Sequence, residues 1–159
     1  MSTLDEFIAT AESHKIRLHA NKEGLKEIAS RHDDAFFQSP LLSLCLAIIA
    51  NERAGKLTTA DVPVWVGATL AKHFDDSTVV RMQLEWSIQY RQRCADSIVF
   101  LENLGLIDIS GETARSIACT SRGHSFVRKV LGQEDEIGIL SRSLMKAFRV
   151  VDYQGLKLL

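Results

Sequence analysis

What this 159-residue sequence lacks already limits what it can be. Its three cysteines are widely spaced and form no Cys-x-x-Cys pair, so neither a zinc ribbon nor a disulfide scaffold is expected. It has only two prolines and no repeats or low-complexity tracts, which excludes a solenoid and a long linker. The most apolar run, residues 41–50, is about half of what a membrane-spanning helix requires. Asp5 and Glu6 stand where a signal peptide needs positive charge, so we expect a cytoplasmic protein.

The sequence also lacks a large excess of positive or negative charge. The formal net charge is −1, with a slightly acidic first half and a slightly basic second half. This is not the strongly basic composition of a typical nucleic-acid-binding domain, so any DNA contact must come from a local patch. The sequence contains no P-loop, no dinucleotide-binding glycine pattern, no nucleophile elbow and no metal-ligating set of histidines. We therefore expect no enzymatic activity, no cofactor and no metal.

Helix-forming residues dominate the first two thirds of the chain. Apolar residues at helical spacing predict short helices in residues 2–14 and 22–31, within an N-terminal helical extension over residues 1–38. Ser39 and Pro40 then form a helix start, and the apolar run behind them predicts a central buried helix that ends near Gly55.

Two further helices are predicted before the helical spacing of apolar residues gives way to alternation. Leu57 to Asp61 has the capping residues of a helix start, and Trp65 lies on the inward face of that helix. The pattern over residues 79–104 predicts either one long helix or two helices with a bend near residues 87–91. Cys45 and Cys94 fall within apolar helical runs, which indicates buried, unreactive thiols rather than metal ligands or nucleophiles.

Alternating residues follow the long helical pattern. Residues 106–109 and 115–120 predict a β-hairpin whose turn contains Gly111. A helix is expected over residues 124–131, and a last amphipathic helix over residues 136–150.

One stretch resembles a known superfamily. Leu101-Glu102-Asn103-Leu104-Gly105-Leu106-Ile107 is similar to the turn that ends the recognition helix of winged-helix (winged helix-turn-helix) domains. A two-stranded wing and a Thr-x-x-Gly turn follow in that superfamily, as the hairpin and Thr120-Ser121-Arg122-Gly123 do here. The resemblance implies a mainly α fold with a β-hairpin wing over residues 39–131. The segment between Leu57 and Leu104 is longer than in a compact helix-turn-helix, which implies an extended recognition helix or an inserted one.

The resemblance also implies candidate contacts with double-stranded DNA. On the long helix, side chains suited to base edges or phosphates are Gln89, Tyr90, Arg91, Gln92 and Arg93. Arg115 on the wing and Arg122 at its base could reach phosphates, as could Arg128 and Lys129. The alternative is a solvated surface whose cations are balanced by the nearby acids Glu85, Asp96 and Glu102.

The C-terminal segment, residues 132–159, carries an amphipathic helix and an apolar tail. Its apolar face is formed in particular by Leu140, Leu144, Phe148 and Val151. This face predicts either a homodimer or protein-partner contact, or packing against the protein's own core.

These observations predict two alternative functions of different classes. The first is a winged-helix DNA-binding protein, a dimeric transcriptional regulator. The second is a non-catalytic winged-helix protein-interaction subunit of a larger complex, such as an accessory subunit of an SMC-like or defence ATPase assembly. A DNA-binding protein should have a continuous positive patch that joins Arg91, Arg93, Arg115 and Arg122, whereas an interaction subunit should have an exposed apolar patch of roughly several hundred Å².

Overall fold

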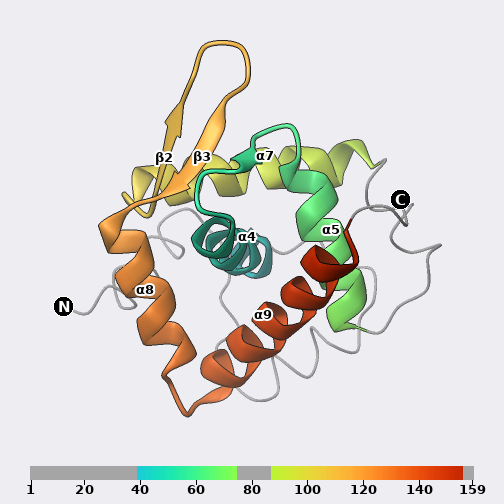
Figure 1. Cartoon of the computed structure of the whole chain (residues 1–159), viewed down its shortest axis with the longest axis vertical. Coiled ribbons are helices and arrows are strands. Elements are labelled where there is room, and N and C mark those ends of the chain that lie inside the picture. Colours follow the sequence, from blue (N-terminus) through green and yellow to red (C-terminus); the bar gives the residue numbers. More distant parts are fainter. Residues whose placement is uncertain (1–38, 75–86, 156–159) are drawn as a thin grey trace.

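The computed structural model describes residues 39–74 and 87–155 (Figure 1). The expected N-terminal helices of residues 1–38 lie outside the described residues. The described part is mainly helical and contains one small antiparallel sheet. In chain order its elements are α4 (Ser39–Arg53), β1 (Leu57–Thr58), α5 (Val62–His73), α7 (Ile88–Asn103), β2 (Ile107–Ser110), β3 (Ser116–Cys119), α8 (Ser121–Leu131) and α9 (Glu136–Gln154).

Helix α4 is the centre of the molecule. Every residue from 41 to 50 is buried, because neighbouring elements cover α4 on all sides. Figure 1 shows α4 nearly end-on, with α5, α7, α8 and α9 arranged around it. The helix ends where Ala54 (φ 45°) and Gly55 (φ 80°) take left-handed backbone conformations, the geometry expected where a glycine follows a helix.

Strand β1 corrects the sequence interpretation of residues 57–61. Leu57 and Thr58 do not start a helix but pair with β3, with Leu57 opposite Ile117, and they extend the hairpin to a sheet of order β1-β3-β2. Asp61 occupies the N-cap position instead, and α5 begins at Val62. A strand of two residues has no periodicity of its own, because it exists through pairing with a distant segment.

Helix α7 has a sharp start. Ser87 is extended (φ −69°, ψ 126°), and its hydroxyl accepts a hydrogen bond from the backbone N–H of Tyr90 at 3.3 Å. A single continuous helix over residues 79–104 is therefore wrong, because Ser87 is not helical and α7 begins at Ile88. Residues 75–86 lie outside the described residues.

Hydrogen bonds of one threonine link the turn from α7 to the sheet with the turn into α8. Gly105 has φ 70°, a conformation that favours glycine and redirects the chain from α7 into β2. Thr120 Oγ1 donates to the Gly105 carbonyl at 2.6 Å and accepts from the Gly123 N–H at 3.0 Å. The same hydroxyl therefore caps α8 and fixes the α7–β2 turn. The predicted hairpin is confirmed, and the helix expected over residues 124–131 begins three residues earlier, at Ser121.

Helix α9 packs against the rest of the described fold. Leu144, Phe148 and Val151 are buried, Leu140 is half-buried against the same core, and the Phe148 ring lies 5.9 Å from the ring of Trp65 on α5. Of the two interpretations of this face, packing on the protein's own core is the one observed. The expectation that these four side chains meet a second molecule is wrong, because they complete an intramolecular core. No helix in the described ranges is long and apolar enough to cross a membrane.

Candidate functional site

Four of the five candidate DNA-contacting residues on α7 lie on its exposed side. Gln89, Arg91, Gln92 and Arg93 are exposed in the first half of the helix. Tyr90 is fully buried, and its hydroxyl donates a hydrogen bond to the Pro63 carbonyl at 2.7 Å. The assignment of Tyr90 to a DNA-binding surface is therefore wrong, because this side chain links α7 to α5 inside the protein.

The outward face of α7 is mixed in character. Arg91 and Arg93 are two positions apart, so they project about 200° from one another around the helix axis. The ridge between them carries Gln92, whose amide donates to the Asp96 carboxylate at 3.1 Å, and Val99, which is 53% exposed. The two arginines are thus on opposite flanks of a ridge that is neutral, acidic and apolar along its length.

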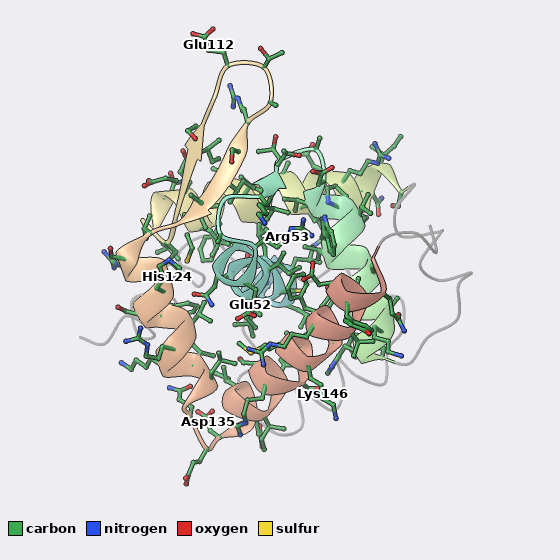
Figure 2. The ribbon with its side chains drawn as sticks, viewed as in Figure 1. Glu52, Arg53, Glu112, His124, Asp135 and Lys146 are labelled. Carbon is green, nitrogen blue, oxygen red and sulfur yellow. The ribbon has the colours of Figure 1, made fainter. Side chains whose placement is uncertain are left out.

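The β2–β3 hairpin carries charges of both signs. Glu112 lies at its tip, as Figure 2 shows, and Asp108 on β2 is exposed. Arg115 is exposed, and its backbone carbonyl accepts a hydrogen bond from the Thr59 N–H at 2.9 Å. The hairpin tip therefore offers an acidic side chain to any approaching surface.

The remaining candidates lie on α8. Arg122 is exposed in the first turn, close to Gly105, whereas Arg128 and Lys129 are exposed in the last turn. Figure 1 shows α8 running from the base of the hairpin toward the start of α9, so its last turn lies away from α7. The predicted cations are solvent-accessible, but the arrangement does not bring all of them to one face.

A polar network that was not anticipated from the sequence surrounds the end of α4. Asn51 Oδ1 lies 2.6 Å from His124 Nδ1 of α8, and Glu52 pairs with Arg149 of α9 at 3.4 Å. Arg53 pairs with Asp152 at 3.2 Å and stacks over Trp65, 3.9 Å from its ring centre (Figure 2). These contacts join α4 to α8 and α9, and their role is structural.

The cysteines offer no reactive group. Cys45 and Cys94 are buried, as predicted, and burial raises the pKa of both thiols, that of Cys94 to about 11. Partial burial also raises the pKa of the Cys119 thiol to about 11. At neutral pH all three are therefore protonated and poorly nucleophilic. Within residues 39–74 and 87–155 no three metal-ligating side chains come together.

The exposed large hydrophobic side chains of the described residues lie on two helices. On α7 these are Ile88 (85% exposed) and Val99, and on α9 they are Ile139 (59%) and Tyr153 (94%). The outer face of α9 was not predicted as a candidate site from the sequence, where only its apolar face was considered. The outer face carries four regularly spaced side chains, Arg142, Lys146, Arg149 and Tyr153.

Comparison with known protein families, with curated proteins and with solved structures finds no significant match for this chain.

Proposed function

We propose that this chain is a non-catalytic protein-interaction subunit of a larger complex, built on a winged-helix domain. Three helices, α4, α5 and α7, followed by the β2–β3 hairpin and the Thr120–Gly123 turn support the winged-helix assignment. The observation that carries the function is the exposure of large apolar side chains on α7 and α9. Each of these helices carries two such side chains, and a helix face with apolar anchors is one of the modes by which proteins bind partners.

The charge pattern supports the same proposal. A phosphate-binding surface requires cations that act together, and the affinity of such a surface depends on how many phosphates it neutralises. Here Asp96 and Glu102 lie on α7, and Glu112 lies at the hairpin tip. These carboxylates would repel the DNA backbone at the positions where a groove-binding helix and its wing approach.

The second candidate is the dimeric DNA-binding transcriptional regulator. It is favoured by one observation, the exposure of Gln89, Arg91, Gln92 and Arg93 in the first half of α7. Residues near the start of a recognition helix are those that contact base edges.

One pair of measurements separates the two functions. The first is fluorescence anisotropy of a labelled random duplex, titrated with the full chain over a range of salt concentrations. Under the proposed function we expect no binding tighter than about 10⁻⁴ M at physiological salt, the weak limit of ordinary non-specific binding. The second is recovery of the tagged chain from its host, followed by size-exclusion chromatography with light scattering, which should show a complex of fixed stoichiometry.

Arg93→Ala provides the control, since Arg93 is exposed on α7 and its removal should leave the complex intact. Tight duplex binding that falls steeply with salt and weakens in Arg93→Ala would establish the DNA-binding function instead. A chain that is monomeric in its host and binds no DNA would contradict both functions.

A further inference from the structure

The outer face of α9 contains a hollow of about 550 Å³. Arg142, Lys146 and Arg149 supply its cationic lining, and Met145, Val150 and Tyr153 supply its apolar lining. This face is opposite to the buried face that carries Leu144 and Phe148, although Met145 at its edge also packs against the core. Figure 2 shows Lys146 pointing away from the body of the protein.

The described residues that line this hollow carry charge of one sign. None of the described residues that line it is acidic. Arg142 donates through Nη1 to the carbonyls of Leu131 and Gln133, at 2.8 and 2.7 Å, so its partners within residues 39–74 and 87–155 are neutral and leave its positive charge in place. Arg149 is paired with Glu52 at 3.4 Å, and Asp152 is engaged with Arg53. Among the residues that the structure describes, Arg142 and Lys146 therefore leave an excess of positive charge on this face.

The hydrogen bonds of Arg142 also hold its side chain in place. A guanidinium fixed by two backbone carbonyls loses less conformational entropy when a partner carboxylate reaches it. Arg142 is thus a preorganised cation at the start of the hollow, and Lys146 is one turn further along the helix.

The apolar groups repeat along the same face. Ile139 is 59% exposed, Met145 and Val150 are half-buried, and Tyr153 is 94% exposed. Ile139 and Tyr153 are about 21 Å apart along the helix at 1.5 Å per residue. This length matches three to four turns of a partner helix, and exposed tyrosine and arginine are the residues most often important in protein interfaces.

We propose that the outer face of α9 binds an acidic amphipathic helix of a partner protein. The cations attract carboxylates on the flanks of that helix, and its apolar stripe packs against Met145, Val150 and Tyr153. This inference rests on the proposed function and names the surface and the chemistry of the partner. The mixed charge of α7 gives no comparable preference for a partner of one sign.

The test uses a defined probe, a fluorescein-labelled 20-residue helical peptide with leucines along one stripe and glutamates on both flanks. Fluorescence anisotropy should show saturable binding to the full chain that weakens as salt is raised. Lys146→Glu and Tyr153→Ser should each weaken binding at least tenfold. Lys129→Glu, the same charge change at an exposed site on α8, should leave affinity unchanged. A peptide with lysines in place of glutamates should bind Lys146→Glu better than it binds the unchanged protein.

Three results would overturn the proposal: no saturable binding of the acidic peptide, equal weakening by Lys129→Glu, or displacement of the peptide by a single-stranded oligonucleotide that binds more tightly. The size-exclusion experiment keeps this failure distinct from failure of the proposed function. If the peptide does not bind but the chain still forms a stoichiometric complex in its host, only the assignment to α9 is wrong.

Discussion

Replacing Gly123 by alanine tests whether the turn into α8 is as tightly packed as the structure indicates. Gly123 is buried in the first turn of α8, and a Cβ built on it would collide with the Leu106 carbonyl oxygen and lie 2.6 Å from Cys119 Sγ. The backbone oxygen cannot move aside as a flexible side chain could. Helix propensity alone makes the opposite prediction, since alanine is favoured over glycine inside a helix by about 1 kcal/mol.

The steric cost of the added methyl group can be compared with the gain in helix propensity. Inserting a methyl group into a packed site costs about 1–3 kcal/mol, and collision with backbone places Gly123→Ala near the upper end of that range. After the gain in propensity, we expect a net loss of about 2 kcal/mol in the free energy of unfolding. For a chain of this size that corresponds to a Tm lower by about 4–8 °C.

Gly132→Ala is the matched control at the other end of the same helix. Gly132 has φ −83°, which alanine adopts without strain, and its Cβ would meet only ordinary contacts at 3.4 Å or more. We expect this variant to be as stable as the unchanged protein or more stable by up to about 1 kcal/mol. Urea unfolding followed by circular dichroism measures both. A Gly123→Ala variant as stable as Gly132→Ala would refute the steric argument.

Three other outcomes are expected. Tyr90→Phe should lower the free energy of unfolding by about 1 kcal/mol in urea titrations, because the Pro63 carbonyl loses its 2.7 Å partner; no loss would mean that water replaces the hydroxyl. In thiol labelling with Ellman's reagent at pH 8, Cys45 and Cys94 should react only after unfolding, and rapid reaction in native buffer would contradict their burial and raised pKa values. Burial lowers the pKa of His73 below its ordinary value of 6.5, so the unfolded chain binds a proton more readily, and the free energy of unfolding should fall as pH drops below about 6.5. His73→Gln should abolish that part of the pH dependence in unfolding measured between pH 7.5 and 5.5, and an unchanged pH dependence would contradict the assignment.

Features with local causes were predictable from the sequence. Ser39-Pro40 marks the start of a helix, Gly105 supplies a left-handed turn, and Thr120 caps a helix through its own side chain. Each depends on residues a few positions apart, so the pattern is visible in one sequence. The mainly helical architecture with a hairpin follows from these local features.

Features with distant causes were not predictable. Leu57 and Thr58 form a strand because β3 is beside them, and nothing in their neighbours indicates this. Tyr90 stands among exposed arginines and glutamines, and only the position of Pro63 shows that its hydroxyl points inward. The hollow on α9 could likewise not be predicted, because its position depends on which face of α9 packs against the core. That face is determined by the packing of α4 and α5 against α9.

The pairing of β1 with β3 has a consequence for the order in which the chain can fold. Strands β2 and β3 are joined by a short turn, so their hairpin can form in microseconds from local contacts. By contrast, Ser116 Oγ donates to the Gly55 carbonyl across a sequence separation of 61 residues. Closing so long a loop carries an entropic cost that is recovered only when the intervening helices have packed. We therefore expect the sheet to close late, with β1 joining the hairpin after α5 and α7 have packed.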